Sequence, residues 1–516
     1  MRFSIMQKIS NIKIKPFEDD RSLLSKACKK AGVKESDVKY FKLIKKSLDA
    51  RDKNAVFYTC TVELSTTPYA PVKKTYGKVK KPSHVLVVGA GPAGLFCALD
   101  LLRYGVAVTL IERGKAVDER VQSVSKFYND RVLDEDCNVQ FGEGGAGAFS
   151  DGKLNTGVGG NFAREVIDDF LLFGAPKDIG YLQKPHIGSD NLKNVVKNIR
   201  NEIIRLGGKV LFSKKLTDIS ISGGKVSKVK INGETETYSD VVLAVGHSAR
   251  DVYALLSDRA VMMESKDFAV GFRIEHLQKD INFAQYGKFA QTKGMPVADY
   301  KLATNQNGRG VFTFCMCPGG YVMPSSSQRE TVVVNGMSNY LRNGENSNSA
   351  IICQVGKKDF GNGLFSGVEF QETLERKAFL LGGENYSAPS MLVGDYLSGN
   401  NSTSFGKVQP TYALGVKKAD LNKLFSQDIN NALKGAILDM GKKIKGFDGY
   451  DAVLTGVESR TSSPIRVLRG DNLSSVSASN LYPCGEGCGY AGGITSAGAD
   501  GKRVAKAIAI KYGLEL

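Results

Sequence analysis

One stretch, from residue 84 to residue 114, constrains the fold of this chain more than any other part of its sequence. Residues 85–88 form an apolar, β-branched run of the length expected for a strand buried on both faces. A glycine-rich turn follows, and Pro92 stands in the first turn of a predicted helix, where its missing N–H costs no hydrogen bond. A second apolar run, 106–111, ends at Glu112. This order predicts a β-α-β unit that binds a nucleotide.

Each of the three glycines in the turn has a physical reason to lack a side chain. Gly89 permits the sharp turn out of the strand, Gly91 lets the backbone approach a pyrophosphate, and Gly94 lets the helix pack closely on the sheet. The N-terminus of the helix then presents free N–H groups and a partial positive charge to the phosphates. Glu112 is expected to accept hydrogen bonds from ribose hydroxyls and to repel a 2′-phosphate.

A β-meander is predicted after this unit. The dipeptides at 223–224 (GG) and 232–233 (NG) are strong hairpin turns, and a helix and a short strand precede them. The next apolar strand, 240–245, runs into Gly246. A meander that returns to a parallel strand ending in glycine is the second half of an FAD-binding fold of the glutathione-reductase type.

Two more glycine-rich segments extend the predicted cofactor site. Residues 138–160 hold four glycines between 142 and 147, and their exposed backbone is suited to lie against a flat ring or a phosphate. Residues 481–513 combine a short strand, a turn with Glu486 and a helix that begins near Gly493. In flavoproteins such an acid binds a ribityl hydroxyl, and such a helix N-terminus faces the ring edge where negative charge develops on reduction. These segments favour FAD over NAD.

Composition bounds the class of protein. The chain has 516 residues, enough for about three domains, and its 42% hydrophobic and 24% charged content is typical of a soluble globular protein. No apolar run has the length needed to cross a bilayer, and the N-terminus lacks a continuous apolar signal segment. Nine irregularly spaced cysteines indicate reduced thiols, so the sequence favours a cytoplasmic protein, or one soluble inside an organelle.

The N-terminal part of the chain is strongly basic and forms a separate unit. Residues 1–81 contain 20 Lys and Arg against 8 Asp and Glu. Residues 1–64 show a β-α-β-β order, typical of part of a ferredoxin-like sandwich, and a proline- and lysine-rich linker follows. The unit lacks the aromatic and glycine signature of an RNA-recognition module, so a solvated basic face is favoured over a nucleic-acid surface.

Several motifs between residue 81 and the C-terminus resemble those of the bacterial and plastid family of uncharacterised FAD-dependent dehydrogenases. They are VGAGPAGL, VQFGEGGAGAFSDGKLNT, AVGHSARD, VGFRIEH, TFCMCPGG, VVNGMS, LRNGENSNSA, LTGVESRTSSPIR and the CGEG-x₃-AGGITSA-x₂-DG block. The resemblance implies bound FAD and leaves the substrate open. The N-terminal KSLDAR also looks like that family, whereas Cys488 and residues 321–327 depart from its pattern.

The predicted architecture is α/β: an FAD-binding Rossmann fold, an inserted α+β substrate domain and the small N-terminal unit. The expected limits are 1–72 for the N-terminal unit with its linker, 82–250 and 451–516 for the FAD domain, and 251–450 for the insertion, which is expected to close over the flavin ring. The residues expected to bind FAD are Gly89, Gly91, Pro92, Ala93, Gly94, Glu112, Arg113, Gly144, Gly145, Gly147, Ser150, Lys153, Gly246, Gly485, Glu486, Gly492, Gly493 and Ile494.

The candidate catalytic residues lie in the insertion. On a regular strand Cys315 and Cys317 would share one face about 6.6 Å apart, near the long end of disulfide geometry. They are either an easily reduced pair or two structural thiols. His276 is the first candidate for acid–base chemistry, although a structural histidine is the alternative, and Arg273 is suited to bind a carboxylate. No metal site is predicted.

The sequence therefore predicts an FAD-dependent oxidoreductase that acts on a small molecule, its flavin reduced by substrate or by diffusing NAD(P)H. A second strand-G-x-G-x-x-G-helix unit is absent, so a built-in nicotinamide domain is not expected, and no cysteine pair near the first helix indicates a dithiol reductase. Two alternatives stay open: an RNA-modifying flavoenzyme that grips RNA with its basic N-terminal unit, and a non-enzymatic flavin-binding or electron-relay protein.

Overall fold

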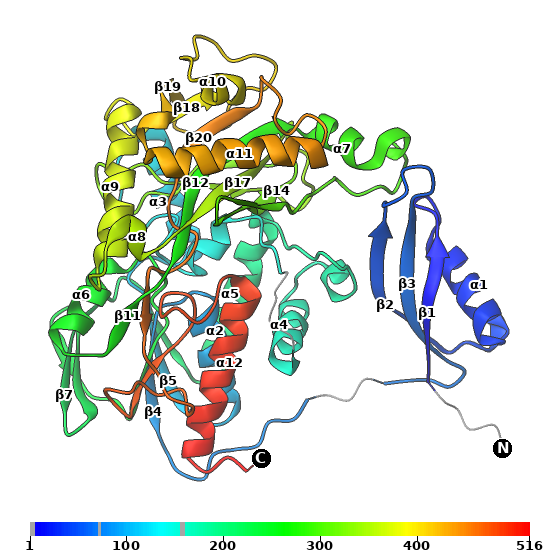
Figure 1. The fold of residues 1–516 in the computed structure, drawn as a ribbon. Helices are drawn as coiled ribbons and strands as arrows, with labels where there is room; N and C mark the ends of the chain where they lie inside the picture. The colour runs from blue at the N-terminus through cyan, green and yellow to red at the C-terminus, as the bar shows by residue number, and fades with distance from the viewer. Residues whose placement is uncertain (1–5, 71–73, 155–159, 516) are drawn as a thin grey trace.

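The computed structural model of this chain describes residues 6–70, 74–154 and 160–515. The predicted limit at residue 72 and residues 155–159 of the second glycine-rich segment lie outside the described residues. Figure 1 shows a large body of two sheets and their helices, with the N-terminal unit set to one side.

A five-stranded parallel sheet carries the predicted nucleotide-binding unit. Its order is β22 (Leu481–Pro483), β10 (Asp240–Leu243), β4 (His84–Val88), β5 (Ala107–Ile111) and β6 (Lys209–Leu211). Helix α2 (Pro92–Arg103) connects β4 to β5 and begins at Pro92 as predicted. The Rossmann-type β-α-β unit is thus confirmed, with parallel strands buried on both faces.

Alternate residues of these strands enter two separate cores. Val85 and Val87 pack with α2, α4 (Asn161–Leu172), α5 (Ser189–Arg205) and α12 (Ile494–Lys511) on one face. Leu86 and Val88 pack on the other face, against α6 (Arg250–Asp258) and the meander of β7 (Leu216–Ser222), β8 (Lys225–Ile231) and β9 (Glu234–Glu236). Both hairpin turns of the meander fall where the sequence predicts them, at 223–224 and 232–233.

A buried ion cluster joins the first helix of the nucleotide-binding part to its last. Lys502 of α12 has no exposed surface, and its Nζ donates to Asp100 Oδ1 of α2 at 3.0 Å and to Asp169 Oδ2 of α4 at 2.5 Å. Gly501 permits the close approach, because a Cβ there would lie 2.1 Å from the carbonyl oxygen of Ala93. The two distant ends of the nucleotide-binding part therefore form one packed layer.

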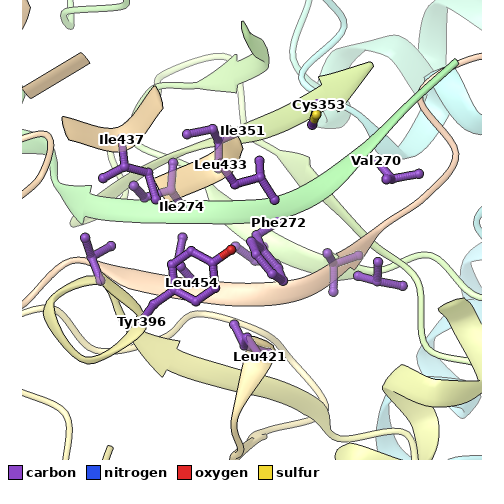
Figure 2. Packing of buried hydrophobic residues seen from close by; sticks show 14 of the residues in the cluster. Val270, Phe272, Ile274, Ile351, Cys353, Tyr396, Leu421, Leu433, Ile437 and Leu454 are labelled. Atoms are coloured by element: carbon purple, nitrogen blue, oxygen red, sulfur yellow. The ribbon is translucent and has the colours of Figure 1, made fainter. Parts of the chain in front are cut away.

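A second, seven-stranded sheet forms the centre of the inserted region. Its order is β13 (Ala303–Gln306), β14 (Arg309–Cys317), β17 (Asn346–Val355), β12 (Phe268–Leu277), β20 (Val453–Glu458), β18 (Ala388–Leu392) and β19 (Val416–Lys418). Every residue of β12 is buried, so this strand is central and not half-exposed as its alternating pattern suggests. Figure 2 shows Leu433 and Ile437 of α11 (Gln427–Lys443) on one side of the sheet and Tyr396 and Leu421 on the other.

The strand β20 corrects one predicted limit. The sequence places residues after 451 in the FAD domain, whereas β20 pairs with β12 and β18 in the seven-stranded sheet. A buried apolar strand has the same pattern in either sheet, which explains the error. The chain rejoins the nucleotide-binding part later, through β21 (Ile465–Val467), which pairs with β11 (Met263–Ser265), and then through β22.

The N-terminal unit has the predicted β-α-β-β order. Strands β1 (Gln7–Ile14), β3 (Phe57–Ser65) and β2 (Tyr40–Asp49) form an antiparallel sheet covered by α1 (Asp20–Ala31). Lys46 joins it to the body, because its N–H donates to the carbonyl of Tyr181 at 2.7 Å and its carbonyl accepts from the N–H of Gln183 at 3.1 Å.

The remaining elements lie outside the two large sheets. They are α3 (Val117–Asp130), α7 (Gln278–Tyr286), α8 (Lys357–Phe360), α9 (Ser366–Leu381), α10 (Val393–Ser398), the hairpin of β15 (Tyr321–Pro324) with β16 (Val334–Met337), and the short 3₁₀ turns Glu35–Asp37, Gly145–Phe149, Lys177–Gly180, Gly287–Phe289 and Leu421–Lys423. Among the helices of residues 6–70, 74–154 and 160–515, none is long and apolar enough to cross a bilayer.

Candidate FAD site

A cavity lies at the carboxyl ends of the parallel strands, where they face the seven-stranded sheet. The volume of this cavity is about 320 Å³. Gly89 follows β4, Glu112 follows β5 and Cys484 follows β22, and all three line it. This edge is where an open α/β sheet binds its ligand, because several loops converge there.

Two helices point uncapped N-termini at this cavity. The N-cap residues are Gly91 for α2 and Gly493 for α12, and neither helix has a side-chain cap hydrogen bond. Both glycines line the cavity. The first N–H groups of a helix have no intrahelical acceptor and carry a partial positive charge, so two anionic or electron-rich groups can be bound at once.

The glycines of this site divide into two physical classes. At Gly94 a Cβ would lie 1.8 Å from the carbonyl oxygen of Gly89, so close packing of the protein demands glycine there. At Gly492 and Gly493, by contrast, a Cβ would meet no protein atom within 4 Å. The space beside these two residues belongs to the cavity. Together with the uncapped helices, this cradle fits FAD.

Glu112 is held by the backbone on three sides. Its Oε2 accepts from the N–H of Ala90 at 2.8 Å, and its Oε1 accepts from Gly114 at 2.9 Å and Gly142 at 3.0 Å. A carboxylate offers about four acceptor positions. One position is therefore left for a ligand hydroxyl, and the other three fix the surrounding turns.

Glu486 lies at the cavity wall and faces a histidine. His247 Nδ1 is 3.2 Å from Glu486 Oε1, and both residues line the cavity. The more buried acid of this region is Asp500, which accepts from the N–H of Gly485 at 2.9 Å and pairs with Arg469 at 2.8 Å. Glu486 is thus free to bind a ligand hydroxyl, whereas Asp500 holds the turn.

The two cysteines of β14 lie at the far end of the cavity, in an irregular strand. The register of β14 shifts between Phe314 and Cys317, and Cys315 has a φ of 44°, in the left-handed region. Cys315 lines the cavity while Cys317 is fully buried, and Cys317 Sγ lies 3.3 Å from the carbonyl oxygen of Cys315. The regular spacing assumed from the sequence is therefore wrong, because a bulge turns the two side chains.

Cations surround this pair of thiols. Lys153 Nζ is 3.6 Å from Cys317 Sγ, and Arg273 Nη2 is 3.8 Å from the same sulfur and 2.9 Å from the carbonyl oxygen of Cys315. A hydrogen bond from Cys317 lowers the pKa of Cys315, and the charges of Lys153 and Arg273 lower it further against the effect of burial. The pKa of Cys317 is raised in turn by its bond to Cys315 and by burial. The pair therefore favours one thiolate, at the cavity wall.

An acid with an unusual pKa completes this end of the site. Glu458, at the end of β20, lines the cavity, and burial raises its pKa to about 7 although Arg273 opposes the shift. Arg273 Nη1 lies 3.6 Å from Glu458 Oε2. Burial tends to lower the pKa of Arg273, but the charges of Glu458, Cys317 and Cys315 outweigh that effect and raise it.

Most of the predicted cofactor residues meet at the cavity. Those that line it are Gly89, Gly91, Pro92, Ala93, Glu112, Arg113, Gly145, Gly147, Ser150, Lys153, Gly246, Glu486, Gly492, Gly493 and Ile494, together with Cys315. Gly94, Gly144 and Gly485 support the turns behind it: a Cβ would clash with Gly89 at the first, with Ala148 at the second and with Ala93 at the third. Arg273 and Cys317 lie directly behind Cys315.

His276 does not reach the site. Its ring is buried in the inserted region, where Nε2 bonds to the carbonyl oxygen of Phe447 at 2.8 Å and the ring packs on Phe447. Burial lowers its pKa to about 4. The acid–base role assigned to it from the sequence is not supported, because its side chain leaves β12 on the face away from the cavity and is absent from the residues that line it.

Sequence reasoning missed several polar residues of the cavity, among them Asp151, Asn335, Glu458 and Arg460. Glu458 was detectable as an acid at the end of an otherwise apolar run. Arg460 was detectable in the same way, because its charged side chain follows the same buried strand. Its guanidinium pairs with buried Glu375 at 2.7 Å. Asp151 stands in a loop and Asn335 in the short strand β16, and both reach the cavity only through the fold.

The family comparisons divide the chain into the same parts. Residues 83–260 match the family described as "Pyridine nucleotide-disulphide oxidoreductase", and residues 267–461 match "FAD-dependent protein, C-terminal domain-like". Residues 6–65 match a domain of unknown function. The second match ends just beyond β20, in agreement with the position of that strand in the seven-stranded sheet.

Among known proteins, an uncharacterized protein of Clostridium beijerinckii is 42% identical over 530 residues, covering 98% of this chain and 99% of the relative. Solved structures are more distant. A geranylgeranyl bacteriochlorophyll reductase-like protein from Thermoplasma acidophilum has 13% identity and a TM-score of 0.36, covering 84% of this chain and 79% of its own. For an L-amino acid deaminase from Proteus myxofaciens the identity is 12% and the TM-score 0.35, with coverage of 86% and 94%. The chain belongs, with its clostridial relative, to a family of FAD-dependent oxidoreductases.

Proposed function

We propose that FAD lies along this cavity with its adenosine end at Glu112 and its flavin ring between Gly145, Gly493 and Cys315, and that a small-molecule substrate or diffusing NAD(P)H exchanges electrons with it. The fold that this assigns is of the glutathione-reductase type, with residues 267–461 as the inserted substrate domain. The observation that carries the proposal is that one cavity is lined both by two uncapped helix N-termini and by the thiol and carboxyl groups of the second sheet.

The residues at the ring end have distinct roles in this proposal. FAD, when bound, supplies reversible two-electron chemistry. Glu458 exchanges a proton with the substrate, because a pKa of about 7 lets it act as acid or base near neutral pH. Arg273 holds positive charge behind Glu458 and Cys315 and orients both. The N-terminus of α12 stabilises negative charge that develops in front of Gly493.

A second groove gives a diffusing molecule a route to the ring end. The volume of this groove is about 580 Å³. Three residues, Phe314, Thr461 and Gly492, line both the groove and the FAD cavity. Its outer wall carries the exposed side chains of Lys357 and Lys358. Aromatic rings near the flavin and lysines further out suit a reductant with a flat ring and phosphate groups, which supports NAD(P)H as a candidate donor.

The test of this placement is a substitution that adds one methyl group to the empty side of the cavity. Gly493→Ala and Gly492→Ala meet no protein atom, so both variants are expected to fold with wild-type circular dichroism. Each methyl group then competes with the cofactor and weakens FAD binding by about tenfold or more, a loss of about 1.4 kcal/mol or more. Binding is measured by FAD fluorescence during reconstitution of the apoprotein.

Wild-type affinity for FAD in both variants would contradict this placement of the ring. A separate experiment identifies the electron donor: NADH, NADPH and a metabolite library are tested for anaerobic bleaching of the bound flavin. The Lys357→Glu/Lys358→Glu double variant is expected to raise the KM for a phosphorylated donor and to leave kcat unchanged, whereas an uncharged donor is indifferent to it.

A further inference from the structure

We propose that Cys315 and Cys317 are a redox-active dithiol that exchanges two electrons with the flavin, cycling between two thiols and one disulfide. This inference rests on the proposed position of the flavin ring at the β14 end of the cavity. It assigns a function to two thiols of β14, one at the cavity wall and one buried, that the site as described leaves unused.

The geometry places the pair between the cavity and the protein interior. Cys315 faces the cavity and Cys317 lies behind it without exposed surface. Cys317 Sγ lies 3.3 Å from the carbonyl oxygen of Cys315, so the buried thiol packs against the backbone of its partner. The register shift of β14 between Phe314 and Cys317 releases the two residues from regular strand geometry, in which a disulfide between them would be strained. A rotation of the side chains joins them in the proposed oxidised state.

The backbone at this point is held in an uncommon conformation. Cys315 has a φ of 44°, and the bulge there removes it from the regular ladder between β14 and β17. Arg273 bonds to the carbonyl oxygen of Cys315 and thereby fixes the bulge from below. A left-handed residue other than glycine costs free energy and is found where function requires a particular side-chain direction. Here the bulge directs Cys315 toward the cavity.

The charges around the pair distinguish it from the other cysteines. Lys153 and Arg273 lie within 4 Å of Cys317 Sγ and favour a thiolate in the pair. Cys353 occupies the neighbouring strand β17, and burial there raises its pKa to about 11. Cys353 therefore stays a neutral, inert thiol in the same sheet, and it provides a matched control.

The step balances without a further reactant. The Cys315 thiolate and the Cys317 thiol together lose two electrons, and an S–S bond forms between their sulfur atoms. The electron pair and the proton of Cys317 pass to oxidised flavin, the oxidant that the family's chemistry supplies. Lys153 stays protonated throughout, beside Cys317 Sγ. In the opposite direction, reduced flavin returns the pair and one proton and opens the disulfide.

The test counts electrons and thiols in the FAD-loaded protein. In an anaerobic dithionite titration, wild-type protein prepared in the oxidised state is expected to take up about four electrons per flavin, two for the ring and two for the disulfide. Cys317→Ser and Cys315→Ser are expected to take up about two, and Cys353→Ala about four like the wild type. Thiol counting under denaturing conditions gives two fewer than the nine cysteines for oxidised wild-type protein, and peptide mapping places the missing pair at Cys315 and Cys317.

A wild-type protein that binds FAD but takes up two electrons per flavin, with all nine thiols present after oxidation, overturns the dithiol proposal and leaves the FAD site intact. Failure of the protein to bind FAD contradicts the proposed cavity, and the thiol count and peptide map then still decide whether the disulfide forms. These two measurements need no variant, so a serine variant that does not fold leaves the decision to the wild-type protein.

Discussion

Arg273 Nη1 and Glu458 Oε2 lie 3.6 Å apart on the neighbouring strands β12 and β20, and within the described residues neither atom has a hydrogen-bond partner. The other N–H groups of the Arg273 guanidinium donate hydrogen bonds to the side chain of Asn348 and to the carbonyl oxygen of Cys315. Two buried polar atoms without hydrogen bonds are costly to the protein alone. Glu458 lines the cavity whereas Arg273 lies behind Cys315, so a ligand reaches the carboxylate of Glu458 from the cavity side.

The first prediction concerns the pH dependence of stability that Glu458 creates. Its pKa in the folded protein is about 7 against an ordinary value of 4.5, so the protonated form favours folding. The resulting stability is complete below pH 4.5 and is lost as the pH rises through about 7. Glu458→Gln is expected to make the protein more stable than wild type above pH 7, by about 3 kcal/mol.

Urea unfolding of the two apoproteins at a series of pH values measures this difference. Parallel curves for the variant and the wild type between pH 5 and 8 would show that Glu458 titrates normally. The same Gln variant, loaded with FAD, is expected to slow reduction by its donor about 10²-fold, since it no longer transfers a proton.

The second prediction concerns Glu375 of α9, which joins the two sheets. It is fully buried and pairs with Arg250 at 2.9 Å and Arg460 at 2.7 Å. Burial tends to raise the pKa of Glu375, but the two arginines outweigh it and hold that pKa well below 4.5. The stability that ionised Glu375 contributes to the protein is therefore present above pH 4.5, and it is lost as the pH falls through the pKa of Glu375 in the folded state.

Glu375→Gln is expected to lower the free energy of unfolding by about 3–5 kcal/mol, because it leaves two buried arginines without their counter-ion. Glu372→Gln is the matched control: this residue is partly exposed and 3.4 Å from Arg250, so its loss should change stability by less than about 1 kcal/mol. Equal effects of the two substitutions would show that the buried pairing contributes no more than the exposed one.

The third prediction separates His276 from catalysis. His276→Ala removes a buried hydrogen bond and ring packing on Phe447, so stability should fall by about 1–3 kcal/mol. FAD content and the rate of flavin reduction should stay within about twofold of wild type. Stopped-flow reduction with the identified donor measures the rate, and a large loss at full FAD occupancy would restore the catalytic role that the sequence suggests.

The fourth prediction is that the N-terminal unit is dispensable for FAD binding. It contacts the body through Lys46, through Lys53, which donates to the carbonyl of Ala284 at 2.7 Å, and through Tyr58, which donates to that of Gly294 at 3.0 Å. None of these residues lines the cavity. A protein that begins at residue 75 is expected to keep FAD at one per chain and to lose about 5 °C in Tm. Loss of FAD from a folded deletion variant would reveal a role of the unit in the site.

Local patterns of the sequence predict the elements of this protein well, because their causes are local. The glycine turn at Gly89, the start of α2 at Pro92 and both hairpins of the meander depend on a few adjacent residues. The five-stranded sheet follows from them, since parallel buried strands have a distinct apolar pattern. The positions of Gly91 and Gly493 at helix N-termini that line the cavity were predictable for the same reason.

The catalytic end of the site was less predictable because its causes are not local. Membership of β20 in the second sheet depends on which strands it meets, and its apolar sequence is the same for either. The bulge at Cys315 depends on Arg273 from another strand. His276 and Arg273 were predicted together from one strand, yet their side chains leave it on opposite sides, with different partners.

The ion cluster of Lys502 has a consequence for how the protein is made in the cell. The ribosome completes α2 and α4 early and α12 only after the whole seven-stranded sheet has been synthesised. Until then Asp100 and Asp169 have Arg103 of α2 as a cation but lack Lys502, and the apolar face that α2 turns toward α12 has no cover. During most of its synthesis the nascent chain thus exposes an apolar surface, which a chaperone is suited to shield. Cofactor loading is a late event of biogenesis, since the pocket closes only when α12 docks.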